Sequence, residues 1–208
     1  MSQLVLLART PEANRALSMA FAAREVSKQY LALSDRKPKK KQGWVKGDME
    51  KGRGGSWMMA RTQQNPAISW FDSVAVREGL RLYRIKPRTG KTHQIRVALK
   101  SIGAPILGDA RYGGTAADRG YLHAWRLQFT LAGEAFDLVC PPAEGALFPL
   151  PELPAATAGL SECQAHAERP ARAGSWPTLT TPWRRGTVTP ACCASSCAAG
   201  FGHCCCCR

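Results

Sequence analysis

Basic and titratable side chains crowd around one predicted turn in the middle of the chain: Arg88, Lys91, His93, Arg96 and Lys100. Apolar residues follow this turn at helical spacing, which predicts a helix over residues 93–102 with Thr92 as its N-cap. The first turn of a helix has free backbone N–H groups and the positive end of the helix dipole, so it attracts anions. A solvated helix face would explain a lone arginine, but the crowding of these side chains favours a site for phosphate groups.

The neighbouring elements must hold this cluster in place. Residues 80–86 alternate in character and predict a strand, which Pro87 ends. Gly90 supplies the backbone freedom for a tight turn. The apolar stripe of the helix consists of Ile95, Ala98, Leu99 and Ile102. Arg96 lies on the other side, so we expect its side chain to point away from the core and toward the basic turn.

Two stretches of this region resemble a known family. Residues 88–97 read RTGKTHQIRV and resemble the R-T-G-R/K-T-H-Q-I-R-V signature of the RluA-type pseudouridine synthases. Residues 103–114 resemble the G-x-P-I-x-G-D-x-x-Y-G pattern of the same family, and the resemblance covers residues 4–142. It implies an isomerase that converts uridine to pseudouridine in structured RNA, either ribosomal or transfer RNA. The family uses one aspartate and neither a metal nor a cofactor.

The resemblance assigns roles to particular residues. Arg96 matches the arginine that partners the family's catalytic carboxylate. Tyr30, in the KQYLA run of residues 28–32, matches the tyrosine that packs on the target base; without the family it reads as a half-buried strand aromatic. Asp109, in the second matched block, is expected to be structural.

The nucleophile itself is expected to be missing. It belongs to an R-L-D-x-x-T-S-G-L motif, and matching its last residue to Leu4 places the aspartate three residues before Met1. We therefore expect the chain as written to be nearly inactive and its catalytic domain to be truncated at the N-terminus. The alternative function is a non-catalytic RNA-binding protein derived from the same fold.

The charge of the chain predicts a polyanionic partner. The net charge is +14, and most of the excess lies in residues 1–150. Residues 35–55 combine lysines with an aromatic and several glycines, which is typical of a mobile loop that tracks a phosphate backbone; a solvated connector is the alternative. We expect RNA, and no DNA, to bind through this loop and the helix cluster, at Lys37, Lys39, Lys40, Lys41, Trp44, Lys46, Arg88, Lys91, His93 and Lys100.

The pattern of elements predicts the fold class. Short turns connect predicted strands over residues 26–33, 56–62, 67–77, 80–86, 121–131 and 135–140. A buried strand over residues 4–8 precedes a helix over residues 11–24, with Thr10 as its N-cap and Pro11 at its start. His123 is expected to be a hydrogen-bonded structural residue. We predict an α+β fold with a largely antiparallel or mixed sheet and flanking helices, in a domain of residues 1–150.

Residues 151–208 have a different composition, rich in Pro, Ala and Cys, and we expect a disordered tail there. Eight of the nine cysteines lie after residue 160, so they form no disulfide framework for the body, and we expect a cytoplasmic protein. Zinc binding by the tail is an alternative, but its adjacent cysteines lack C-x₂-C spacing, and we expect no metal. No apolar run approaches the roughly 20 residues that span a membrane, and we expect no membrane partner.

Overall fold

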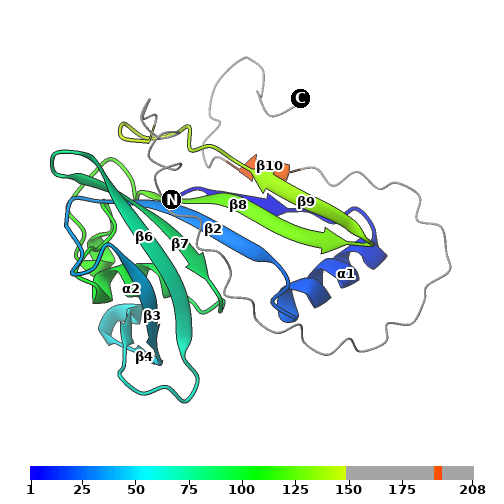
Figure 1. Cartoon of the computed structure of the whole chain (residues 1–208), viewed down its shortest axis with the longest axis horizontal. Coiled ribbons are helices and arrows are strands. Elements are labelled where there is room, and N and C mark those ends of the chain that lie inside the picture. Colours follow the sequence, from blue (N-terminus) through cyan, green and yellow to red (C-terminus); the bar gives the residue numbers. More distant parts are fainter. Residues whose placement is uncertain (149–189, 194–208) are drawn as a thin grey trace.

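A six-stranded antiparallel sheet forms the centre of the fold. The computed structural model describes residues 1–148 and 190–193. The strand order across the sheet is β3-β6-β7-β2-β8-β9, and every neighbouring pair is antiparallel. The strands are β2 (Ser27–Ser34), β3 (Gln42–Gly47), β6 (Ala67–Arg77), β7 (Leu80–Pro87), β8 (Leu122–Leu131) and β9 (Glu134–Val139). With the helices described below, this sheet confirms the predicted α+β fold (Figure 1).

Two tight hairpins join neighbouring strands. Gly79, between β6 and β7, has a φ of +68°, and Ala132 and Gly133, between β8 and β9, have φ of +51° and +81°. In the β8–β9 hairpin both central residues have positive φ, which gives a turn whose twist matches that of the strands it joins. The predicted strand 67–77 has the same bounds in the structure, because Pro66 limits it at one end and the β6–β7 hairpin limits it at the other.

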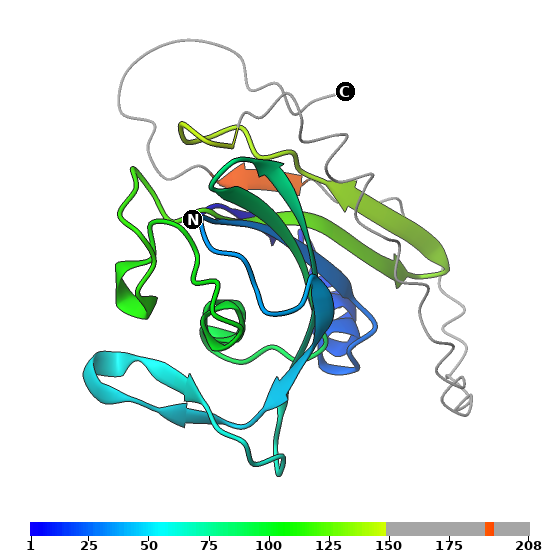
Figure 2. The same cartoon turned by 60° about the vertical axis from the view of Figure 1, so that its left-hand side comes forward.

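Helix α2 (Gln94–Ser101) packs its apolar stripe onto the sheet. Ile95, Ala98 and Leu99 belong to the main hydrophobic core, together with Leu82 and Ile85 of β7. Figure 2 shows this green helix end-on, inside the curve of the sheet. The opposite side of the helix is thereby left for polar side chains.

Helix α1 (Pro11–Ala22) begins as predicted. The Thr10 hydroxyl accepts a hydrogen bond from the Ala13 N–H at 3.2 Å, and Pro11 occupies the first turn. The buried side of the helix joins a second, smaller core cluster with Val26, Leu127 and Phe129.

Residues 35–55 contain more regular structure than predicted. They include β3, β4 (Met49–Lys51) and a 3₁₀ turn (Arg53–Gly55), and β4 pairs with β5 (Trp57–Met59). The prediction of one mobile loop is therefore wrong. In β3 the buried Val45 alternates with the exposed Trp44 and Lys46, a two-residue period that the many charges obscured.

The chain begins with β1 (Gln3–Leu6), whose described side chains are half-buried rather than buried. It pairs with β10 (Pro190–Cys193), so the prediction of an unstructured tail is wrong for these four residues. Apart from Cys192 and Cys193 of β10, the cysteines of the tail lie outside the described residues. Cys140 is disulfide-bonded, which the cysteine pattern did not predict. Within the described part of the chain, no helix has both the length and the apolar character needed to cross a membrane.

Candidate functional site

A buried glutamine shapes the turn between β7 and α2. Gln94 Oε1 accepts hydrogen bonds from the Thr89 hydroxyl at 2.8 Å and the Lys91 N–H at 2.9 Å. Its Nε2 donates to the Ile68 carbonyl at 3.0 Å and to the Ser69 hydroxyl at 2.9 Å. These four bonds fix the basic turn to β6. Sequence reasoning gave Gln94 no role, although a glutamine beside an apolar stripe was a signal that it could be buried.

The start of α2 differs from the prediction. His93, not Thr92, is the N-cap; its φ is +58°, and no side chain caps the helix. A left-handed backbone at a residue other than glycine costs on the order of 1–3 kcal/mol and persists only where its surroundings hold it. Here Gln94 already fixes the turn, and His93 Nδ1 lies 2.8 Å from the Tyr112 hydroxyl oxygen.

Arg96 points away from the core, as predicted. It contacts Asp109 and Tyr112 of the loop after α2, whereas we expected it to point toward the basic turn. Arg96 Nε donates to Asp109 Oδ2 at 2.7 Å, and Arg96 Nη2 donates to Asp109 Oδ1 at 2.6 Å. The side chain of Asp109 is 2% exposed and that of Arg96 17%, so these charge-assisted bonds are shielded from water. Hydrogen bonding to Asp109 raises the pKa of Arg96, against the effect of burial. Arg96 is therefore a permanent cation with a fixed orientation.

A glycine-rich loop brings Asp109 to this position. The Asp109 carbonyl accepts a hydrogen bond from the Gly114 N–H at 2.9 Å. A Cβ on Gly114 would lie 1.9 Å from the Ile106 oxygen, and a Cβ on Gly108 would lie 1.8 Å from another backbone oxygen. Only glycine fits at these two positions, which explains the glycines of the second matched pattern. The position of Asp109 agrees with the structural role expected of it. Its carboxylate holds the Arg96 guanidinium in a fixed orientation.

Tyr112 contacts several side chains of the basic cluster around the start of α2. Arg96 Cζ lies 4.6 Å and Lys100 Nζ 5.7 Å from the centroid of its ring. Its hydroxyl accepts a hydrogen bond from the Trp57 N–H at 3.2 Å and faces His93 Nδ1. Burial, followed by the charge of Arg96, lowers the pKa of His93, so its ring is neutral near pH 7. Tyr112 was the central residue that sequence reasoning missed, although it is the tyrosine of the matched motif.

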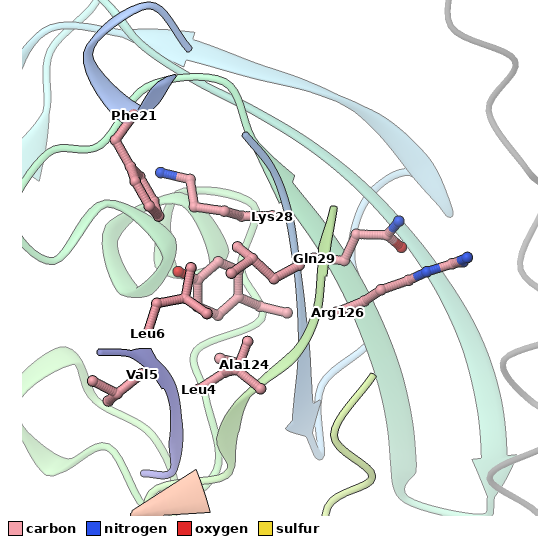
Figure 3. Close-up of a pocket in the computed structure, with 10 residues that line it drawn as sticks. Leu4, Val5, Leu6, Phe21, Lys28, Gln29, Ala124 and Arg126 are labelled. Carbon is pink, nitrogen blue, oxygen red and sulfur yellow. The ribbon is translucent and has the colours of Figure 1, made fainter. Parts of the chain in front are cut away.

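Tyr30 lies on β2 and lines a pocket of about 250 Å³. Figure 3 shows that Phe21 and Lys28 lie on one side of β2, whereas Gln29 and Arg126 point to the other side. Burial raises the pKa of Tyr30, so its hydroxyl keeps its proton at neutral pH. The remaining lining comes from β1 and β8: Leu4, Val5, Leu6, Ala124 and Leu127. A tyrosine ring in a largely apolar pocket suits a flat aromatic ligand.

Lys28 connects this pocket to the basic turn. Its Nζ lies 5.6 Å from the centroid of the Phe21 ring, and a Cβ built on Gly90 would lie 3.8 Å from the same nitrogen. The ammonium group therefore lies beside residues 88–91. Lys28 was not among the RNA-binding residues predicted from the sequence.

The other predicted RNA-binding residues lie on β3, before β3 and in the basic turn. Trp44 and Lys46 are exposed on β3, and the Arg88 guanidinium carbon lies 5.8 Å from the centroid of the Trp44 ring. Lys91 donates a hydrogen bond to the Asn65 carbonyl. The connection from β2 to β3 exposes four further lysines: Lys37, Lys39, Lys40 and Lys41.

His123 has the structural role predicted for it. It is buried, its Nε2 lies 2.6 Å from the Cys140 carbonyl oxygen, and its Nδ1 lies 2.8 Å from the Ser2 hydroxyl oxygen. Among residues 1–148 and 190–193, no group of three histidine, cysteine or acidic side chains is placed to hold a metal ion. Apart from Cys192 and Cys193, the cysteines of the zinc hypothesis lie outside the described residues.

Comparison with known proteins gives one consistent similarity. Residues 4–101 match the family model described as RNA pseudouridylate synthase. A Haemophilus influenzae protein named an uncharacterized RNA pseudouridine synthase is 48% identical over 146 residues, which cover 69% of this chain and 65% of the relative. The ribosomal large subunit pseudouridine synthase C of Rickettsia bellii is 35% identical over 116 residues, covering 54% of this chain and 38% of that protein.

A solved structure shares the fold. It is the human RNA pseudouridylate synthase domain containing 1, with a TM-score of 0.56 at 23% identity, and the match covers 74% of this chain and 66% of that one. The chain spans 65% and 38% of the lengths of the two bacterial relatives named above.

Proposed function

We propose that this chain binds structured RNA and supplies residues for the isomerisation of uridine to pseudouridine, because the chain belongs to the RNA pseudouridylate synthase family. The observation that carries the proposal is Arg96, a partly exposed cation fixed beside the start of α2 within the matched signature. The proposed substrate is ribosomal or transfer RNA, and the name of the Rickettsia relative favours ribosomal RNA. The proposal includes no metal or cofactor and places the reaction in the cytoplasm.

The reaction requires the target uridine to be flipped out of the base stack of the RNA. It breaks the bond between C1′ and N1, rotates the uracil and joins C1′ to C5. C5 then releases its proton to water, and N1 takes up a proton, so that the product is an isomer of the substrate. The flipped base would enter the pocket beside Tyr30 and pack on its ring. Lys28 and the turn of residues 88–91 would hold the neighbouring phosphates.

Arg96 has a second edge available for a carboxylate. Asp109 takes Nε and one N–H of Nη2, whereas a guanidinium carries five N–H groups. The side of Nη1 can therefore bind another carboxylate with parallel charge-assisted bonds. We assign this edge to the family's nucleophilic aspartate, which Arg96 would keep ionised and oriented. Arg96 is thus a positioning residue.

The hydrogen bonds of the aspartates in this chain favour the proposal that the nucleophile lies outside it. Each accepts at least one hydrogen bond that fixes it in the fold: Asp35 from Thr115, Asp48 from Gln64 and Asn65, Asp72 from Arg84, Asp109 from Arg96, Asp118 from Tyr121, and Asp137 from Arg126. The family motif places the nucleophile before the position of Leu4. Loss of a nucleophile lowers kcat by a factor on the order of 10⁴–10⁶, so the chain as written is expected to be nearly inactive.

The test compares this chain with one extended by the in-frame upstream codons. Release of tritium from RNA labelled at C5 of uridine reports the formation of pseudouridine. We expect release by the extended chain and nearly none by this one. Equal release by both chains would overturn the proposal that the nucleophile lies outside.

The second candidate is a non-catalytic RNA-binding protein, which the engagement of every aspartate favours. It predicts no tritium release by either chain, although both bind RNA with a steep salt dependence. Absence of both release and binding would overturn both candidates.

A further inference from the structure

A pair of tryptophans, one of them exposed, lies near the β3 edge of the sheet, away from the Tyr30 pocket. Trp44 of β3 is the register partner of Trp70 of β6, and their ring centroids are 5.2 Å apart at an interplanar angle of 67°. Trp44 is 45% exposed, whereas Trp70 is half-buried. The half-buried ring of Trp70 therefore supports the exposed ring of Trp44. β3, which carries Trp44, is an edge strand of the sheet (Figure 1).

The strand register places this pair on the opposite face from Tyr30. Trp70 is paired with Lys86 of β7. Ile85, the residue of β7 just before Lys86, is paired with Tyr30 of β2. Consecutive residues of a strand point to opposite faces of a sheet. Trp44, Trp70 and Lys86 thus share one face, and Tyr30 shares the other with Ile85.

Two cations flank the exposed ring. Lys46 Nζ lies 5.5 Å and Arg88 Cζ 5.8 Å from the centroid of the Trp44 ring. Four exposed lysines, residues 37 and 39–41, precede β3 and continue the positive charge. An unpaired nucleotide has the complementary chemistry, because it offers an aromatic face next to a phosphate.

Arg88 also relates this surface to the candidate active site. It belongs to the turn that Gln94 fixes against β6, and its guanidinium reaches the ring of Trp44. An RNA strand that contacts this turn can therefore place one nucleotide near Lys28 and another at Trp44.

We propose that Trp44, with Lys46 and Arg88, stacks an unpaired base of the RNA substrate outside the pocket that receives the target uridine. This inference rests on the proposed RNA-binding function and adds a second recognition point to it. The site recognises single-stranded nucleotides next to the target and makes no use of base edges, so it tolerates any base.

The test measures the affinity of the full chain for labelled oligouridylate and for a duplex RNA by fluorescence anisotropy. Stacking contributes about 1–3 kcal/mol per base, so W44A should weaken binding to oligouridylate by about 5- to 150-fold. The slope of log K against log salt should not change, because no charge is removed. W44L should behave like W44A, and W44F should keep most of the affinity.

Two controls distinguish stacking from other effects. M19A removes an equally exposed apolar side chain, 50% exposed on α1, and should leave the affinity unchanged. K46A should reduce the salt slope by about 1. Thermal melting of each variant verifies that it is folded.

Three results would overturn the inference: wild-type affinity in W44A and W44L, an equal loss on duplex RNA, or an equal loss in W44F. In each of these, binding of RNA by the wild-type chain would leave the proposed function intact. No binding of RNA by the wild-type chain would overturn both.

Discussion

Replacement of Asp109 by asparagine keeps the shape of the side chain but removes the charge that Arg96 faces. The amide nitrogen of D109N would also meet one of the N–H donors of the guanidinium. Removal of one partner from a buried ion pair costs about 3–5 kcal/mol, because the other charge is left without compensation. Arg96 is 17% exposed and keeps some access to water, so we expect a loss near the lower limit, about 3 kcal/mol. For a domain of this size, such a loss lowers Tm by about 6–12 °C.

The assay is urea unfolding followed by tryptophan fluorescence for wild type, D109N, R96M and the double variant. The double variant should lose less than the sum of the single losses, because no unpaired charge remains. D137N is the matched control. Asp137 and Arg126 also form a two-point pair, but their side chains are 45% and 28% exposed, so its loss should stay below about 1 kcal/mol. Equal losses in D109N and D137N, or additive losses at residues 96 and 109, would refute the reasoning.

Two further predictions use the same unfolding assay. Q94A removes four hydrogen bonds and leaves buried donors and acceptors of the turn unpaired, so it should cost at least about 2 kcal/mol; a loss within about 0.5 kcal/mol would show that the turn does not depend on Gln94. Burial lowers the pKa of His123, so the folded state favours its neutral form, and the stability this provides is present above its ordinary pKa of about 6.5 and lost as pH falls below it. The free energy of unfolding should fall between about pH 7 and pH 5, and it should fall less steeply in H123Q; an equal slope in both would contradict this assignment.

The features that sequence reasoning predicted correctly are those set by neighbouring residues. The cap of α1 depends on Thr10 and Pro11, which are adjacent, and the strand 67–77 is limited by Pro66 and a glycine turn. The apolar stripe of α2 follows from its period alone and also fixes the direction of Arg96.

The features that it did not predict depend on residues distant in sequence. Asp109 reaches Arg96 only because a loop with two obligatory glycines turns the chain back toward α2. The cap of α2 moved to His93 because Gln94 bonds to β6, which no local rule for N-caps includes. In β3, pairing with β6 overrode a composition that is typical of a loop.

The central claim is that Arg96 positions the catalytic carboxylate. Its most direct test is the single-turnover rate of tritium release by the in-frame extended chain, with arginine or with lysine at this position. R96K keeps the charge but loses the fork that can bind two carboxylates. We predict a rate lower by a factor on the order of 10²–10³, with RNA affinity and its salt dependence unchanged. An unchanged rate, or a rate loss that an equal loss of RNA affinity explains, would contradict the claim.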